Sequence, residues 1–173
     1  KEYPLRGREC SSEQMPFIKE KFGTYDKFAK ANMEDVFGEE KLKKALHPQA
    51  STFATSFIEN NIDKPWKIRK LPNSVQLSST NGIIVSDFNN DNNLDIALSG
   101  NMFGSEVETP RNDAGNGNVL LGDGLGNFNT LSINESGFYT PGDVKGINKI
   151  IIEGVLHLAI INNNDVLQFF KFN

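Results

Sequence analysis

Residues 83–98 read IIVSDFNNDNNLDIAL, and this stretch decides the class of fold that we expect. Two short apolar runs, residues 83–85 and 96–98, flank a loop of Asp and Asn. Short apolar runs bounded by turn-forming residues are typical of β-strands. Asn and Asp tolerate left-handed backbone and favour tight turns. The stretch therefore predicts two strands joined by an acidic loop.

The same texture extends along the chain from residue 51 to its end. The sequence holds 21 Asn among 173 residues, which favours a turn-rich β protein. Turns recur every 8 to 12 residues or so, as all-β folds show. We expect strands at residues 51–58, 66–71, 83–85, 96–98, 118–121, 128–133, 144–152, 155–161 and 166–172.

Residues 1–50 have a different pattern. An extended lead-in over residues 1–10 precedes four short helices, the first capped by Ser11 or Ser12 and running to Phe22. Thr24 and Asn32 cap the next two, and residues 39–47 form the last, which Pro48 ends. Each helix is too short to be stable alone, so we expect this segment to pack on the β part.

The β part holds an internal repeat. Residues 51–117 form a copy with the acidic loop, and residues 118–173 form a final copy in which only Glu153 and Gly154 replace that loop. A copy of about 50 residues is close to the period of a propeller blade. Propellers typically need about four to eight four-stranded blades, and this length supplies about two to three. The chain is then a fragment of a propeller, an oligomer that completes one, or a small sheet packed against the helices.

The acidic loop, residues 87–95, offers oxygen atoms at alternating positions. Asp87, Asn89, Asp91 and Asp95 supply side-chain oxygens, and Asn93 supplies a backbone carbonyl. Ca²⁺ takes about six to eight such oxygens, whereas Mg²⁺ prefers to keep its waters. The loop is not an EF-hand, because Leu98 stands where that pattern requires Glu. The alternative is an Asx-rich surface turn without a metal.

The loop and its flanks resemble the D-x-[DN]-x-D-G-x-x-D-[VIL] loop of FG-GAP/VCBS repeats, the blades of integrin α-chain propellers and of many bacterial surface proteins. Residues 121–128, LGDGLGNF, are similar to the hairpin that follows such a loop. Residues 8–17 and 104–115 look like the C-terminal part of large bacterial VCBS-repeat proteins, some of the ASPIC/UnbV type. The resemblance covers most of the chain.

This resemblance implies a mainly β fold of two to three propeller blades with a short N-terminal helical segment. It also implies Ca²⁺ held by Asp87, Asn89, Asp91, Asn93 and Asp95. The expected location is extracytoplasmic, which means the bacterial cell surface, the outer membrane or the secreted fraction. The family has Gly where this chain has Asn92, which lowers the expected affinity for Ca²⁺. Because the final copy lacks the loop, we expect one ion per chain.

Two surfaces are candidates for binding a protein or a glycan. The long segment 102–117 carries Glu106, Glu108, Arg111 and Asp113, and long loops on rigid sheets often carry recognition. Its alternative is a solvated insertion in which Arg111 pairs with a neighbouring acid. Trp66, among basic residues, is suited to stacking on a sugar; its alternative is a strand with Trp66 pointing inward.

Composition excludes several classes of protein. The net charge is -4, and residues 81–128 hold seven acids and one base, which excludes a basic nucleic-acid platform. The apolar runs are too short to insert in a membrane, and the single Cys10 excludes an intrachain disulfide. The chain begins at Lys1, so we expect a mature chain or a piece of a longer one.

Function follows from these observations as an expectation. The sequence holds no nucleophile elbow, phosphate loop or Cys/His cluster, which favours a non-catalytic module. We expect a calcium-stabilised extracellular repeat that binds a protein or a glycan. The alternative is an accessory or catalytic segment of a carbohydrate-active enzyme. A third possibility is an assembly module that pairs sheet edges between molecules or completes a propeller with another chain.

Overall fold

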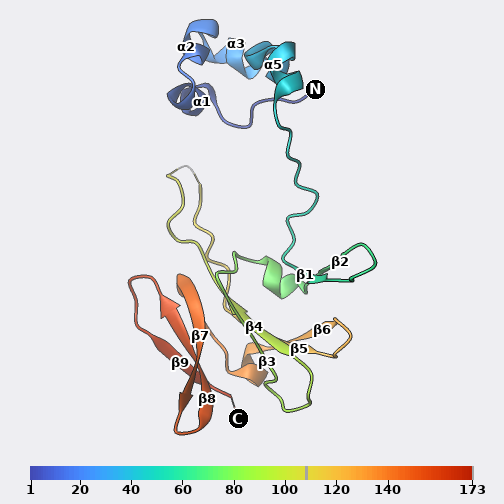
Figure 1. The fold of residues 1–173 in the computed structure, drawn as a ribbon. Helices are drawn as coiled ribbons and strands as arrows, with labels where there is room; N and C mark the ends of the chain where they lie inside the picture. Colours follow the sequence, from blue (N-terminus) through green and yellow to red (C-terminus); the bar gives the residue numbers. More distant parts are fainter. Residues whose placement is uncertain (108, 173) are drawn as a thin grey trace. The chain divides into compact units, whose positions relative to one another are not determined.

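The computed structural model describes residues 1–107 and 109–172 (Figure 1). The chain divides into two compact units, Lys1–Ser51 and Thr52–Asn173. Short helices build the first unit, and the strands of the described residues all lie in the second. The prediction of a mainly β fold with a few short N-terminal helices is confirmed. The described residues show no closed propeller, and the assignment to propeller blades stays a prediction.

Five short helices form the N-terminal unit. Its buried side chains pack on one another in a small core of Ile18, Phe22, Phe28, Ala31 and Val36. Since none of these helices is long enough to be stable alone, this mutual packing holds the unit together. Packing of the helices on the β part stays a prediction. The helices are α1 (Arg8–Gln14), α2 (Phe17–Lys21), α3 (Tyr25–Ala29), α4 (Met33–Phe37) and α5 (Glu39–Lys44).

Two helix starts lie where the sequence predicts them. The Thr24 side chain accepts a hydrogen bond from the backbone N–H of Lys27 at the start of α3. Asn32 forms a capping box with Asp35 at the start of α4, because each side chain accepts the other residue's backbone N–H. Such caps satisfy N–H groups that have no partner inside the helix.

The first predicted helix is wrong in its bounds. It begins before Ser11, at Arg8, and it is broken in two before it reaches Phe22. The break is at Met15, whose φ of -134° and ψ of 82° are not helical. Pro16 causes it, because a proline ring disfavours helical backbone in the preceding residue. The last predicted helix also ends early, at Lys44.

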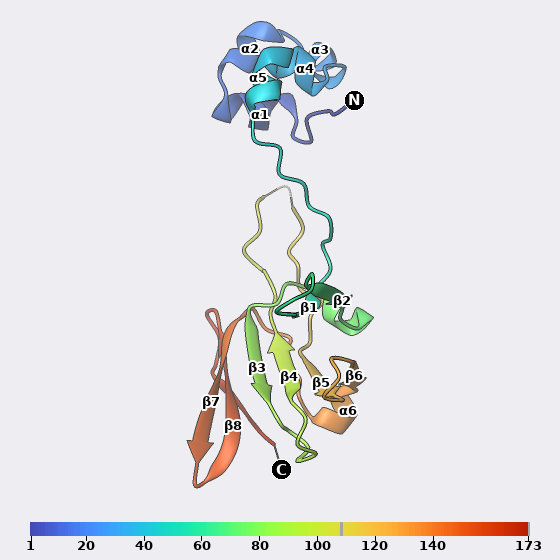
Figure 2. The ribbon, with the colours of Figure 1, turned by 45° about the vertical axis from the view of Figure 1, so that its right-hand side comes forward.

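The described part of the C-terminal unit forms three antiparallel sheets (Figures 1 and 2). β1 (Ser56–Glu59) and β2 (Lys67–Lys70) make a hairpin, followed by the short helix η1 (Asn73–Gln76). A four-stranded sheet contains β3 (Gly82–Ser86), β4 (Asp95–Ser99), β5 (Asn118–Gly122) and β6 (Phe128–Leu131) in sequence order. After α6 (Ile133–Ser136) comes a three-stranded sheet of β7 (Val144–Ile152), β8 (Val155–Asn162) and β9 (Gln168–Lys171).

Several details of this unit differ from the sequence reading. The strand expected at residues 51–58 begins only at Ser56. The strand expected at 128–133 ends at Leu131, because Ser132 and Glu135 form a capping box that starts α6. The boundary between the two sequence copies, at residues 117 and 118, falls inside the four-stranded sheet. In that sheet β3 and β4 come from the first copy, and β5 and β6 come from the second. The boundaries of the sequence copies therefore do not coincide with the boundaries of the sheets.

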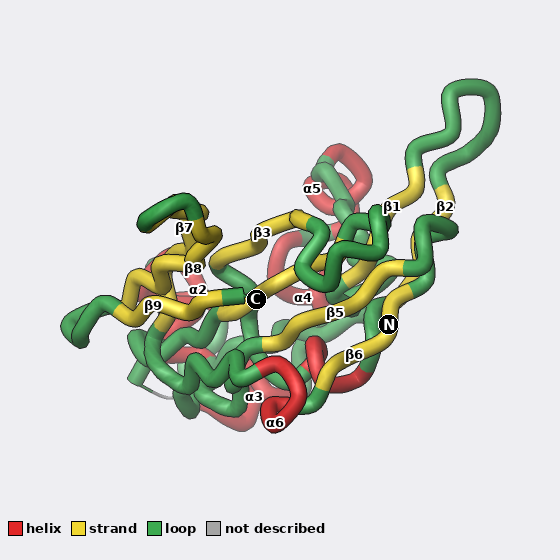
Figure 3. Tube along the Cα trace, turned by 90° about the horizontal axis from the view of Figure 1, so that it is seen from below, coloured by secondary structure: helices red, strands yellow, loops and turns green. Residues whose placement is uncertain are grey.

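The main core lies between the four-stranded and three-stranded sheets, which lie beside each other in Figures 2 and 3. Ala97 and Val119 are cross-strand partners, and both are fully buried. They pack in one cluster with Leu158 and Ile160 of β8. The opposite face of the four-stranded sheet is partly covered by the β1–β2 hairpin and η1, through a second cluster of Leu71, Val75, Leu98 and Leu120.

Candidate metal centre

The acidic loop connects β3 to β4. Ser86 and Asp95 are cross-strand partners, so residues 87–94 form the whole connection. Asn90 and Asn92 have left-handed backbone, with φ of 61° and 68°. Asn adopts this conformation more readily than other residues with a side chain. The loop therefore makes its left-handed turn at Asn92 without glycine.

Three predicted ligands fold their side chains back on the loop. Asp87 accepts hydrogen bonds from the backbone N–H groups of Asp91 and Asn92, at 3.2 and 2.9 Å. Asn89 Oδ1 also accepts from the N–H of Asp91, at 3.1 Å. Asp91 Oδ1 in turn accepts from the N–H of Asn93, at 2.7 Å. These bonds hold the three side chains in fixed positions along one turn.

The carboxylates of the loop carry charge without a basic partner. The N–H of Asn93, and after it the amide of Asn89, hold the pKa of the Asp91 carboxyl below its ordinary value. Among the described residues, no ion pair involves Asp87, Asp91 or Asp95. Close carboxylates repel one another unless solvent or a cation relieves them. The loop is thus a local concentration of negative charge.

Asp95 is the buried member of the set, with no exposed surface. Its Oδ2 accepts a hydrogen bond from the N–H of Phe88 at 2.8 Å. Its Oδ1 accepts one from the N–H of Gly122, on β5, at 2.9 Å. One carboxylate therefore ties the start of the loop to the neighbouring strand, and both of its oxygens are engaged.

The hairpin at residues 123–127 packs on the acidic loop. Asp123 accepts from the N–H groups of Leu125 and Asn127, and from the Asn127 amide at 2.6 Å. The Asn127 bonds lower the pKa of the Asp123 carboxyl. Gly124 has a φ of 72°, which favours glycine, and a Cβ there would lie 2.6 Å from Asn93 Oδ1, so the hairpin and the acidic loop approach closely at this point. The sequence predicts the hairpin, but it carries no signal for this contact.

The residues present fit Ca²⁺ in their chemistry. Asp87, Asp91 and Asp95 offer carboxylates, Asn89 an amide oxygen and Asn93 a main-chain carbonyl, and Ca²⁺ binds such oxygens. Each engaged oxygen keeps a second lone pair. Among the described residues, no group of three or more His, Cys, Asp or Glu is placed to hold a metal ion. The Ca²⁺ assignment thus stays a proposal.

The other predicted binding residues do not form one site. Arg111 pairs with Asp113 at 2.7 Å, as the alternative of a solvated insertion expects, and it lies over the Phe103 ring, 4.6 Å from its centre. Glu106 lies in the same loop, and Glu108 lies outside the described residues. Trp66 belongs to the β1–β2 connection and is 66% exposed, so the inward alternative for this residue is wrong.

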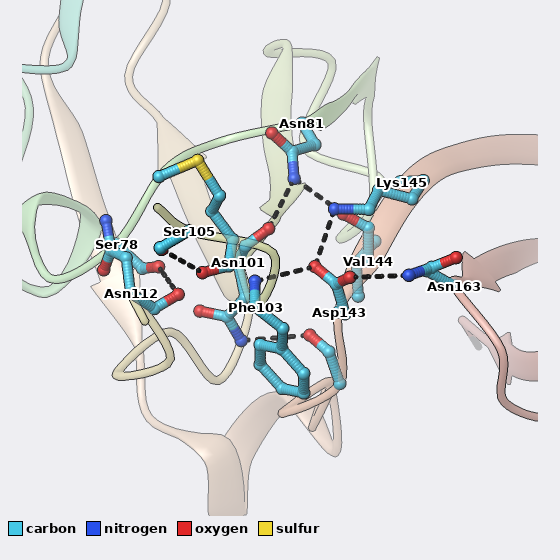
Figure 4. A network of polar contacts seen from close by, with 12 residues as sticks. Ser78, Asn81, Asn101, Phe103, Ser105, Asn112, Asp143, Val144, Lys145 and Asn163 are labelled. Carbon is cyan, nitrogen blue, oxygen red and sulfur yellow. Dashed lines mark hydrogen bonds and ion pairs between the residues drawn. The ribbon is translucent and has the colours of Figure 1, made fainter. Parts of the chain in front are cut away.

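A buried polar network at the base of segment 102–117 is a feature that sequence reasoning missed (Figure 4). Asn101 is fully buried, donates to the carbonyls of Gly115, Pro141 and Gly142, and accepts from the N–H of Gly115. Asn81 donates to the carbonyls of Asn101 and Val144. We name these contacts, with those of Asp143, the polar clamp.

Asp143 completes the polar clamp. It is nearly buried, and it accepts from Lys145 Nζ at 2.7 Å, from the Phe103 N–H and from the Asn163 amide. The Lys145 ammonium is the main reason that the pKa of this carboxyl is lowered. The clamp anchors both ends of segment 102–117 to the start of β7. In a turn-rich sequence, the pattern around an Asn does not indicate that its side chain will be buried in such a network.

Comparison of the chain with protein-family models, with curated proteins and with solved structures finds no significant match. Within the described residues, none of the helices has the length and apolar character needed to cross a bilayer. The fold and the loop chemistry are therefore the basis for any functional assignment.

Proposed function

We propose that the acidic loop binds one Ca²⁺ and that the C-terminal unit is a calcium-stabilised, non-catalytic binding module of the FG-GAP/VCBS type. The observation that carries this proposal is the set of three carboxylates within nine residues, none of them paired with a base among the described residues. A bound cation relieves the repulsion that such a set creates.

The ion's role is structural in this proposal. Asp87, Asn89, Asp91, Asn93 and Asp95 hold it, and its charge offsets theirs. Because Asp95 also bonds the N–H of Gly122, a better-ordered loop strengthens the contact between β4 and β5. The proposed effect of Ca²⁺ is therefore on the stability of the four-stranded sheet.

The site suits a location outside the cytoplasm. Ligand charge sets calcium affinity, and extracellular modules bind Ca²⁺ with Kd of about 0.1 to 1 mM. Among the proposed ligands, Asn89 offers a neutral amide and Asn93 a main-chain carbonyl, and the affinity of the site is expected to be modest. Such a site fills where free Ca²⁺ is abundant, which is the case at a cell surface and in secretions.

The test is a calcium titration by calorimetry, followed by thermal unfolding in Ca²⁺ and in EGTA. We expect one ion per chain and a Tm higher by about 5–15 °C in saturating Ca²⁺, since a ligand at 100 times its Kd adds about 2.7 kcal/mol. Asp91→Ala is expected to remove most of this rise.

The matched control is Asp123→Ala. Asp123 is also an exposed carboxylate that holds a turn, in the neighbouring hairpin. We expect it to lower Tm by the same amount in both buffers and to keep the calcium-dependent rise. Absence of bound Ca²⁺, or an equal loss in both buffers for Asp91→Ala, contradicts the proposal.

The proposed ligand surface is segment 102–117, whose base the polar clamp holds. Within this segment Arg111 is exposed, lies over the Phe103 ring and is paired with Asp113. A fixed guanidinium beside an aromatic ring and a carboxylate suits recognition of hydroxyl and acidic groups on a glycan. Glu106 and Trp66 are further candidates.

A glycan array, probed with the labelled chain in Ca²⁺ buffer, tests this surface. Arg111→Ala is expected to weaken binding by about tenfold or more, as arginines at binding hot spots do. Lys41→Ala, at an exposed base on α5 that is not among the candidate residues, is the control and should bind normally. Unchanged binding by Arg111→Ala contradicts the assignment of this surface.

A further inference from the structure

One apolar face of the three-stranded sheet is not covered by any other element in the described part of the C-terminal unit. Side chains alternate between faces along a strand, and Ile147, Leu158 and Ile160 occupy the core face. Cross-strand pairing places the intervening residues on the other side. We name that side the outer face. Its larger apolar members are 40–50% exposed: Ile150, Ile152, Ile161 and Phe169.

A second apolar surface lies on the four-stranded sheet, on the side that faces away from the main core. There, a cavity of about 570 Å³ opens between the β1–β2 hairpin and the acidic loop. Its walls include Phe57, Val85, Leu94 and Phe128. Val85 and Leu94 are 46% and 65% exposed, and Ile83 beside them is 58% exposed. We name this surface the cavity face.

The two faces carry opposite charge. On the outer face, the charged or titratable side chains within β7–β9 are His157 and Lys171, which are direct cross-strand partners. The rim of the cavity face carries two acids, and Arg69, a base that bonds the lining residue Asn127, is itself paired with Glu59. Asp91 precedes the lining residue Asn92, and Asp123 lies between the lining residues Gly122 and Gly124. Packing an outer face on another outer face, or a cavity face on another cavity face, brings like charges together. Packing an outer face on a cavity face pairs opposite charges.

We propose that the outer face of one chain packs on the cavity face of a second copy, so that this protein associates head to tail. The contact repeats between molecules the sheet-on-sheet packing that already joins the two larger sheets within the chain. Apolar side chains such as Phe169 enter the cavity, and Lys171 meets the acidic rim. A contact between two different faces of one molecule is heterologous, so each copy keeps one face open for another.

Sedimentation velocity from about 1 to about 200 µM tests the proposal, a range that brackets micromolar association. The experiment is run in Ca²⁺ and in EGTA, so that failure of the calcium proposal is seen separately. We expect assemblies that grow with concentration in both buffers. Wild-type protein that stays monomeric at every concentration overturns the proposal.

Two variants each block one face. Phe169→Asp and Val85→Asp are expected to weaken association by about 100-fold or more, because each buries an unpaired charge in an apolar contact. Ile62→Asp, at a residue 96% exposed in the β1–β2 connection, is the control and should associate normally. Normal association by either face variant overturns the proposal.

Mixing the two face variants gives the decisive result. Phe169→Asp keeps its cavity face, and Val85→Asp keeps its outer face, so the mixture should form dimers that grow no further. A mixture of folded variants that stays monomeric overturns the proposal. If either face variant fails to fold, Lys171→Glu, at an exposed position on the outer face, is measured by itself. We then expect association that is weakened several-fold, and unchanged association overturns the proposal.

Discussion

Two turns of this molecule do the same geometric task by different means. The acidic loop joins β3 to β4 with eight connecting residues, and Glu153 with Gly154 joins β7 to β8 with two. Both use left-handed backbone, at Asn90 and Asn92 in the first and at both residues of the second. Closing a hairpin therefore does not require three carboxylates, and the extra residues of the first turn serve other purposes.

One of those purposes is visible in the core. Phe88, the second residue of the acidic loop, is buried in the main cluster, with its ring 4.5 Å from that of Phe172. The short turn contributes no such residue, since Glu153 is exposed. The acidic loop is thus anchored in the core by an aromatic ring, while the Asp87 and Asp91 carboxylates accept hydrogen bonds from backbone N–H groups of the loop itself.

Among the variants that test this comparison of the two turns, Phe88→Ala is expected to change the free energy of unfolding most. Removing the ring should lower the free energy of unfolding by about 3–5 kcal/mol, through lost burial and the cavity left behind. Urea denaturation measures it, with Ile151→Ala, 64% exposed beside the short turn, as the control. Comparable losses for the two variants would show that the loop has no anchoring role.

Asp95→Asn comes next. The amide keeps one acceptor and places an NH₂ group where a backbone N–H now donates, so either Phe88 or Gly122 loses its bond. A buried donor without a partner costs about 1–3 kcal/mol. Urea denaturation in EGTA isolates this cost from any ion. A variant as stable as the parent would mean that Asp95 does not tie the loop to β5.

The smallest effect concerns the left-handed residues themselves. Asn tolerates this backbone better than Glu, so Glu153→Gly should stabilise the chain by about 1 kcal/mol and Asn92→Gly by less. The difference in Tm between each variant and the parent measures this in EGTA. A larger gain at Asn92 would show that the acidic loop, rather than the short turn, is the strained one.

Sequence patterns with a local physical cause were predictable. Thr24 and Asn32 cap helices because their side chains reach N–H groups three residues ahead. The apolar runs around the acidic loop form strands because turn residues bound them on both sides. The same local reasoning could have found α6, since Ser132 and Glu135 have the spacing of a capping box.

Features that depend on distant contacts were not predictable. Phe88 is surrounded by Asp and Asn in the sequence, and no local sequence pattern indicates that its ring packs against Phe172. Asn101 looks like any turn residue, although carbonyls about 40 positions away fix it. Among the metal candidates, the alternation of oxygens is local, whereas the bond from Asp95 to Gly122 crosses 27 positions.

That bond makes the backbone amide of Gly122 a natural reporter. The amide proton is held by a carboxylate that belongs to the acidic loop, yet it lies on β5. Hydrogen exchange at this one amide therefore follows the order of the loop from a neighbouring strand. Its protection factor measures, at a single residue, how strongly the order of the acidic loop is coupled to β5.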